Sequence, residues 1–298
     1  MKSSMKTSVL PLLFIALSCG RITSAVGEVP TNFQRENLVA WCIAHNWDSV
    51  DRDPGQRAGL LEQLGIGRYA YNWRSEDSPQ FEQEILHCNR RGIEFFALWN
   101  EHPEAFASFE KHGIRPQIWK INPSPRGDSH EVRVAAAVNR LLQVVKDAKK
   151  FDFQFGLYNH GGWGGEPENL VAVCEAFHQR GFDNVGIVYN FHHGHAHIGR
   201  FADSLARMKP YLLCINLNGM ADPDSVDEKS KKNKILPIGS GNHEAFMIKT
   251  IIDSGYTGPI GVLGHVPNRD VAITLRENLD GLGELLDRLD HGLRPDPK

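Results

Sequence analysis

The sequence predicts an α/β fold, a single (β/α)8 TIM barrel. Eight short apolar runs, rich in β-branched and aromatic residues, are each followed by a longer segment whose apolar residues recur at helical spacing. The chain of 298 residues also suits a barrel, which typically needs about 250 residues. A doubly wound open sheet uses the same alternation and is the alternative.

Each predicted strand has an apolar middle and ends in polar residues. The strands are expected at residues 38–44, 68–73, 93–99, 114–121, 153–158, 185–189, 212–217 and 260–263. The helices are expected at residues 54–64, 79–91, 103–112, 129–149, 167–180, 198–208, 243–253 and 271–289. Pro54 suits a first helical turn, and Gly65 and Gly113 suit helix ends. The one irregular connection, 219–242, carries a charged run at 222–234 that we expect to be a solvated loop.

Residues 1–25 have the pattern of a secretory signal peptide. Lys2 and Lys6 precede an apolar run at 9–17 that is too short to span a bilayer, and small residues follow that offer a cleavage site. We therefore expect an exported protein, periplasmic or secreted, whose mature chain has no transmembrane segment. A lipid anchor at Cys19 is a weaker alternative, because alanine stands three positions before it instead of a larger aliphatic residue.

Composition and charge are those of an ordinary globular protein, with the barrel expected at 30–292 and a tail at 293–298. The hydrophobic content is 41% and the formal net charge is −3, so a nucleic-acid partner is not expected. The cysteines outside the signal segment are widely spaced, so we expect buried free thiols and no cysteine metal site. These are Cys42, Cys88, Cys174 and Cys214.

Amide, imidazole and charged side chains gather at the predicted strand ends. They are His45 and Asn46, Asn72 and Arg74, Glu101 and His102, Lys120 and Asn122, Asn159 and His160, Asn190 and His193, Asn216 and Asn218, and His265. In (β/α)8 barrels the active site lies at the C-terminal ends of the strands. Amides and imidazoles can hold a polyhydroxylated ligand, and imidazoles can also ligate a metal. The joint pattern therefore predicts a functional site at these ends.

The densest group of histidines follows the sixth strand, where His192, His193, His195 and His197 lie close together in the sequence. Their side chains can ligate a metal, form hydrogen bonds or transfer protons near neutral pH. We expect His197 at the exposed start of a helix and leave the role of His192 open. A lone histidine at a strand end more often only caps or hydrogen-bonds, so the group carries more weight than any member.

Strand alternation predicts which amides face the barrel interior. Asn190, Asn216 and Asn218 fall on inward positions. They either orient the hydroxyl groups of a ligand or only fill the interior with satisfied amides. Trp163 lies in a glycine-rich segment after the fifth strand, where an indole suits stacking on the face of a sugar.

Several segments resemble the xylose isomerase-like TIM barrels, a superfamily that includes sugar isomerases, sugar-phosphate epimerases and the endonuclease IV type of DNA-repair enzyme. The resemblance extends over 38–289. It rests on the segments 156–162, 185–193, 214–220, 236–241 and 255–262, which recur in this order in the superfamily. The resemblance implies the barrel fold, a sugar substrate and a metal centre that usually includes carboxylate ligands.

The chain departs from the superfamily pattern at the acidic metal ligands. Tyr158 stands at the place of the glutamate on strand five, Asn190 at that of the aspartate on strand six, and His265 at that of the glutamate on strand eight. His193 matches a ligand that the superfamily keeps. Asn216 and Asn218 stand where histidine and aspartate are common on strand seven. Without carboxylates, a hard cation such as Mg²⁺ is disfavoured and the usual proton-transfer bases are missing.

The resemblance and its departures together imply proton transfer next to the carbonyl group of a carbohydrate, with one divalent transition metal such as Zn²⁺ or with none. The candidate metal ligands are His160, His193 and His265, with His195 as a spare ligand. The candidate acid and base groups are Lys120, Glu101 and His160. The candidate sugar-binding residues are Asn72, Trp163, Asn190, Asn216 and Asn218.

Other functions fit the same residues. A non-catalytic carbohydrate-binding barrel follows if the missing carboxylates mean lost turnover. A lyase or eliminase acting on oxidised sugars uses the same proton abstraction. An endonuclease IV-like enzyme is disfavoured by the signal segment, by the absence of a basic excess and by the missing acidic zinc ligands.

Overall fold

The computed structural model describes residues 29–74, 79–227, 229–230 and 232–291. The predicted signal segment at 1–25, with Cys19, and the predicted tail at 293–298 lie outside these residues. The strands are β1 (Leu38–Trp41), β2 (Arg68–Asn72), β3 (Glu94–Trp99), β4 (Gln117–Ile121), β5 (Phe155–Tyr158), β6 (Val185–Asn190), β7 (Leu212–Leu217) and β8 (Ile260–Leu263).

The α-helices follow the strands in turn. They are α1 (Pro54–Leu64), α2 (Phe81–Arg90), α3 (Pro103–His112), α4 (His130–Lys150), α5 (Gly162–Gly165), α6 (Pro167–His178), α7 (Phe201–Met208), α8 (Glu244–Asp253) and α9 (Val271–Asp290). Three short 3-10 helices at strand ends also matter for the site: His45–Trp47, Phe191–His193 and His195–Arg200.

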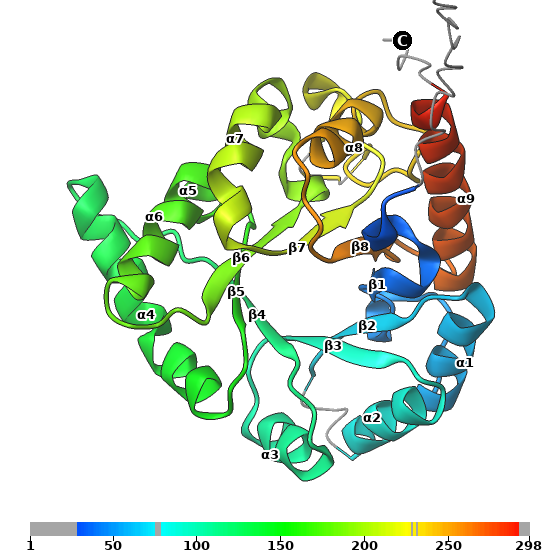
Figure 1. Cartoon of the computed structure of the whole chain (residues 1–298), viewed down its shortest axis with the longest axis horizontal. Coiled ribbons are helices and arrows are strands. Elements are labelled where there is room, and N and C mark those ends of the chain that lie inside the picture. The colour runs from blue at the N-terminus through cyan, green and yellow to red at the C-terminus, as the bar shows by residue number, and fades with distance from the viewer. Residues whose placement is uncertain (1–28, 75–78, 228, 231, 292–298) are drawn as a thin grey trace, which may run out of the picture.

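The strands close into a barrel in the order β1 to β8, with β8 pairing with β1. All neighbouring strands are parallel. The long helices form a ring outside them (Figure 1). This confirms the (β/α)8 TIM barrel and excludes the open sheet. Strand β4 begins at Gln117, later than the sequence suggests, because Pro116 directly before it has no N–H to donate to the ladder.

Large aromatic side chains fill the inside of the barrel. Trp41 and Trp119 pack edge to face with ring centroids 5.2 Å apart, and Tyr158 lies 5.9 Å from Trp41. Gly156 makes room for them, because a Cβ at this position would lie 2.8 Å from Cδ1 of Trp119 and 2.5 Å from Val188. The interior is therefore a packed core, and ligand access is left to the ends of the barrel.

A second apolar layer lies between the strands and the surrounding helices. On β5, Phe155 and Leu157 belong to this outer layer while Tyr158 faces inward, as strand alternation predicts. Cys42, Cys88, Cys174 and Cys214 are buried free thiols, which confirms that expectation. Among the residues described, no helix combines the length and apolar character needed to cross a membrane.

Candidate functional site

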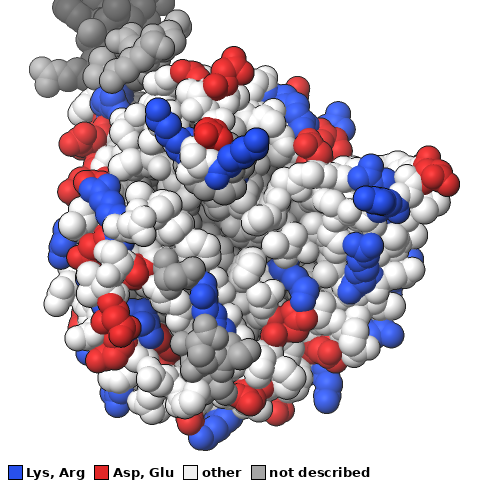
Figure 2. Space-filling model, turned by 180° about the vertical axis from the view of Figure 1, so that it is seen from behind, with Lys and Arg blue, Asp and Glu red and all other residues white. Residues whose placement is uncertain are grey.

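A cavity of about 680 Å³ opens at the C-terminal ends of the strands. Its walls come from the segments after β1, β5, β6 and β8 and from the connection between β7 and α8. The lining residues are Trp47, His160, Gly161, Gly162, Glu166, His192, His193, His195, Ala196, His197, Lys234, Ile235, His265 and Pro267. Seen from behind in Figure 2, the molecule is hollowed near the middle of its face, and most of the surrounding residues are uncharged.

The predicted pair His160 and His193 lies together on one wall. Their ring centroids are 4.3 Å apart, and the ring of His193 packs edge-on against Tyr158 at 5.8 Å. His193 belongs to the 3-10 helix Phe191–His193, which turns the chain out of β6 and frees its side chain from strand alternation. The ring of His192 is 3.9 Å from that of His193. Three imidazoles therefore form a contiguous polar surface.

His197 is buried, with 3% exposure, which corrects the expectation of an exposed helix start. Its Nδ1 lies 3.0 Å from the hydroxyl of Tyr189, and its Nε2 lies 3.4 Å from Oε2 of Glu166. Arg200 donates to the same carboxylate oxygen at 2.5 Å. The packing of the 3-10 helix His195–Arg200 against β6 turns the ring inward, so His197 joins the cavity wall instead of the outer surface.

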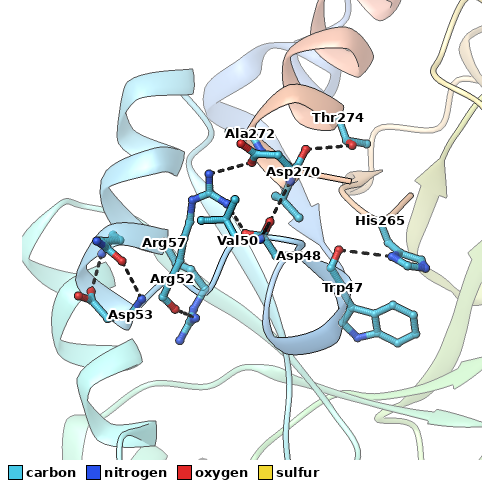
Figure 3. Close-up of polar contacts among 12 residues, drawn as sticks. Trp47, Asp48, Val50, Arg52, Asp53, Arg57, His265, Asp270, Ala272 and Thr274 are labelled. Carbon is cyan, nitrogen blue, oxygen red and sulfur yellow. Dashed lines mark hydrogen bonds and ion pairs between the residues drawn. The ribbon is translucent and has the colours of Figure 1, made fainter. Parts of the chain in front are cut away.

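The opposite side of the barrel contributes Trp47 and His265. The two rings pack edge to face with centroids 4.4 Å apart, and Nδ1 of His265 lies 3.4 Å from the backbone oxygen of Trp47. Figure 3 shows both side chains on the same side of the β1–α1 connection. Because β1 and β5 are four strands apart in a closed barrel of eight, this aromatic wall faces the wall that carries His160.

Lys234 is buried at the cavity, with 7% exposure, which corrects the expectation that the whole charged run 222–234 is a solvated loop. An isolated bridge between Gly219 and Leu236 folds the end of this connection back toward β7. Glu244 stabilises this folded-back connection by accepting hydrogen bonds from the backbone N–H groups of Met220, at 2.9 Å, and Gly241, at 2.8 Å. These contacts bring Lys234 to the mouth of the barrel.

A layer of asparagines lies inside the barrel and away from the cavity lining. Oδ1 of Asn159 accepts from the backbone N–H of Asn190 at 2.7 Å and from its side chain at 3.0 Å. Asn216 donates to Oδ1 of Asn190 at 2.8 Å. A Cβ at Gly261 would lie 1.8 Å from Oδ1 of Asn216, so only glycine fits beside this amide. Asn190 and Asn216 thus satisfy one another as a buried network.

Asn218 and Asn72 are also buried, with 1% and 6% exposure. Asn218 donates to the backbone oxygen of Gly219 at 2.8 Å, while no residue in the described part of the chain donates to its Oδ1. Asn72 ends β2, and its backbone oxygen lies 3.0 Å from Nε2 of His45. Neither asparagine belongs to the lining of the cavity.

Lys120 and Glu101, the candidate acid and base groups, form an ion pair with each other. Neither lines the histidine cavity. Trp119 and Ile121 pack with the interior cluster, so Lys120 between them points outward. Trp163 also lies elsewhere, with its ring 4.8 Å from the guanidinium of Arg133 on α4. The structure therefore separates these three residues from the predicted site.

Burial lowers the pKa of several cavity histidines. Desolvation lowers the pKa of His192 well below its usual value, and the nearby positive charge of Lys234 acts in the same direction. Desolvation also lowers the pKa of His265, although its contact with the oxygen of Trp47 opposes the shift. For His197, burial outweighs the opposing effect of Glu166, and its pKa is lowered too. These rings are therefore neutral near pH 7 and can both donate and accept hydrogen bonds.

The candidate metal ligands His160, His193 and His265 all line the cavity, but they do not form an assembled centre. His265 packs against Trp47 on the wall opposite His160. In the described part of the chain, no group of three or more His, Cys, Asp or Glu side chains is placed so that it could hold a metal ion. Zn²⁺ needs three or four convergent protein ligands and Mg²⁺ prefers oxygen. The donor set in this arrangement does not fit either ion.

The chain shares its fold with xylose isomerase-like TIM barrels. No protein-family model and no curated protein matches the sequence. The IolI protein with a bound zinc atom has a TM-score of 0.64 at 11% identity, covering 84% of this chain and 98% of that one. The 3-keto-D-glucoside 4-epimerase YcjR from E. coli has a TM-score of 0.59 at 10% identity, covering 83% and 97%.

A xylose isomerase-like TIM barrel protein from Mycobacterium smegmatis, in complex with magnesium, has a TM-score of 0.53 at 14% identity. It covers 86% of this chain and 97% of that one. At identities this low the likeness establishes the common barrel alone and leaves the chemistry to the residues of this chain.

The cavity lining also contains residues that were not among the site residues predicted from the sequence, and four of them have polar or aromatic side chains that bear on the site: Trp47, Glu166, His197 and Lys234. All four lie outside the strands, in segments whose path only the folded chain defines. Trp47 follows directly after His45 and Asn46 at a strand end, so its place in the sequence carried a usable signal. Glu166 and Lys234 carried none, because isolated charged residues in connections are usually solvated.

Proposed function

We propose that the protein is an exported barrel that binds a carbohydrate or sugar derivative in the histidine-lined cavity and catalyses proton transfer next to its carbonyl group, as isomerases and epimerases do. The observation that carries this proposal is the cluster of imidazoles around a cavity of about 680 Å³, a volume within the usual range for small-molecule sites. The common fold with a 3-keto-D-glucoside epimerase supports a sugar ligand. The signal-like pattern at 1–25 supports export, which N-terminal sequencing of secreted protein tests.

His160 and His193 are the pair to which we assign proton transfer. One imidazole accepts the proton from the carbon next to the carbonyl, and the electron pair of the broken C–H bond forms the C=C bond of an enediol. The carbonyl oxygen takes a proton from the other imidazole. Isomerisation follows when the former carbonyl carbon takes a proton and the hydroxyl group on the neighbouring carbon gives its proton to an imidazole, which forms the new carbonyl. Epimerisation follows when a proton returns to the opposite face of the original carbon and the enediol hydroxyl that was the carbonyl oxygen gives its proton back to an imidazole, which restores the carbonyl. An imidazole accepts a proton when it is neutral and donates one when it is protonated, so a pair of them can supply both roles.

Protein side chains carry every step of this scheme, because the histidines of the described chain do not converge on a metal position. Lys120 and Glu101 have no assigned step, because they are paired away from the cavity. Treatment with a chelator is therefore expected to leave activity in place. Loss of activity on chelation, with recovery on adding zinc, contradicts the assignment.

A non-catalytic carbohydrate-binding protein is the second candidate. Glu166 is the one carboxylate among the described residues of the cavity lining, and Arg200 already pairs with it. A site with so little basic oxygen suits hydrogen bonding to hydroxyl groups without turnover. In this case His160 and His193 contribute affinity alone.

Hydrogen exchange at the substrate carbon distinguishes the two candidates without knowledge of the product. We expect ¹H NMR in D₂O to show the protein removing the C–H signal next to the carbonyl of at least one sugar in a panel of ketoses, aldoses and 3-keto-glucosides. His160→Ala and His193→Ala should each slow this exchange by about 10²-fold or more. Lys120→Ala is the matched control and should retain the wild-type rate.

Two other outcomes have distinct meanings. Saturable binding without exchange, lost in His193→Ala, supports the non-catalytic candidate. Absence of both binding and exchange for every sugar in the panel contradicts the assignment of the cavity to carbohydrates.

A further inference from the structure

The indole of Trp47 occupies the place in the cavity that the sequence suggested for Trp163. It follows β1 in the 3-10 helix His45–Trp47, and its ring forms one wall together with His265 and Pro267. The opposite wall carries His160 and the histidines after β6. The cavity is therefore two-sided, with an aromatic face on the β1–β8 side and imidazole donors and acceptors on the β5–β6 side.

We propose that Trp47 is the platform on which the apolar face of a sugar ring packs, so that the hydroxyl groups on its other side reach the imidazoles. This inference rests on the proposed carbohydrate ligand and names the subsite that orients it. A pyranose or furanose ring exposes C–H groups on one face, and a large flat aromatic ring buries them without competing for the hydroxyl groups. The preferred ligands are monosaccharides with at least one face free of axial hydroxyl groups.

A clasp formed by Asp48, Arg52 and Asp270 fixes the segment that carries Trp47. Arg52 pairs with Asp48 and also donates to Oδ1 of Asp270 at 2.8 Å, which joins the β1–α1 connection to the N-cap residue of α9 (Figure 3). The side chain of Asp48 is only 2% exposed, and its Oδ1 accepts from the backbone N–H of Val271 at 3.1 Å. Ser49 donates to the backbone oxygen of Arg269 at 3.1 Å.

These bonds come from residues next to Trp47 on one side and next to the His265 segment on the other. The clasp therefore holds both members of the aromatic wall in place before a ligand arrives. A ring that is already ordered loses little conformational entropy on binding, which favours affinity. Arg52 is accordingly a positioning residue for the platform and does not itself reach the cavity lining.

Fluorine NMR of protein labelled with 5-fluorotryptophan tests the platform directly. The chain has six tryptophans, and Trp47→Phe identifies the Trp47 signal. Titration with D-fructose, D-glucose and a 3-keto-glucoside is expected to move the Trp47 signal and to leave that of Trp163 in place. Trp47→Ala should weaken sugar binding about tenfold or more, Trp47→Phe should weaken it less, and Trp163→Ala, the matched control, should not weaken it.

The positioning role of the clasp is tested by comparing a variant of Arg52 with a control variant of Arg269. Arg52→Gln should weaken sugar binding less than Trp47→Ala does and should broaden the Trp47 fluorine signal. Arg269→Gln removes a surface ion pair with Glu277 and should change neither property. If Trp47→Ala does not fold, the fluorine signal of the wild-type protein and the sugar affinity of Trp47→Phe still decide whether Trp47 packs against the sugar.

The failure of this inference is distinguishable from the failure of the proposed function. If a sugar binds and its affinity depends on His193 while the Trp47 signal does not move, the platform is refuted and carbohydrate binding stands. If none of the three sugars binds, both fail together.

Discussion

Two polar layers near the C-terminal ends of β5, β6 and β7 differ in how their side chains are satisfied. In the inner layer, Asn159, Asn190 and Asn216 bond to one another and are fully buried. In the outer layer, rings such as those of His160 and His193 line an open cavity. One layer directs its hydrogen bonds into the protein and the other presents polar groups to a space that a ligand can enter.

The difference shows which polar residues at strand ends support the barrel and which serve a ligand. A buried amide network rigidifies a core when all its members are satisfied, and it becomes costly when one is removed. Imidazoles at a cavity wall contribute less to folding, and their exchangeable protons are available for chemistry. We therefore expect substitutions in the two layers to separate stability from ligand binding.

The largest effect on stability is expected for Asn216→Ala. This change removes the hydrogen bond to Asn190 and leaves a buried acceptor without its donor, so it should lower the free energy of unfolding by about 2–4 kcal/mol. Urea denaturation followed by circular dichroism measures the change. Asn139→Ala on the exposed face of α4 is the control and should stay within about 0.5 kcal/mol of wild type.

The distinction between the two layers is contradicted if His193→Ala lowers the free energy of unfolding as much as Asn216→Ala does. The distinction is also contradicted if Asn216→Ala leaves stability unchanged and abolishes sugar binding, because the inner layer would then serve the ligand directly.

Lowering the pH is expected to reduce the stability of the fold by a smaller amount. The pKa values of His192, His197 and His265 are lowered in the folded protein, chiefly by burial. When the pH falls below about 6.5, the unfolded chain takes up protons at these positions before the folded one does. Stability is therefore complete above that pH and declines as the pH falls toward the folded pKa values.

Thermal unfolding between pH 7.5 and pH 5.5 measures this decline. The Tm should fall across the interval, and His265→Asn should make the fall shallower because one titrating group is gone. A Tm that stays constant or rises as the pH falls contradicts burial of neutral imidazoles at the cavity.

The barrel and the region of the site could be predicted from sequence because both depend on local periodicity. Alternation within strands indicated that Asn190 and Asn216 face inward, and the polar strand ends identified the mouth of the barrel. The same alternation also shows why Lys120 lies outside, since Trp119 and Ile121 beside it face inward. A position at a strand end was thus not sufficient for a place in the site.

The remaining differences come from connections whose path depends on distant contacts. Trp163 lies in the short helix α5 and packs against Arg133, a residue from another helix. Lys234 reaches the cavity through the bridge between Gly219 and Leu236. The bend that turns His197 inward is a 3-10 helix that sequence periodicity does not reveal. Such contacts are set by tertiary packing, which no local pattern encodes.

The most direct test of the central claim is histidine NMR during a sugar titration. The chain has 14 histidines, and imidazole labelling with ¹³C reports each of them separately. Saturating sugar from the exchange panel is expected to shift the signals of cavity histidines, led by His160 and His193. The signals of His87 on α2 and His178 on α6 should not move. Shifts confined to histidines outside the cavity, with the cavity signals unchanged, contradict the assignment of this site.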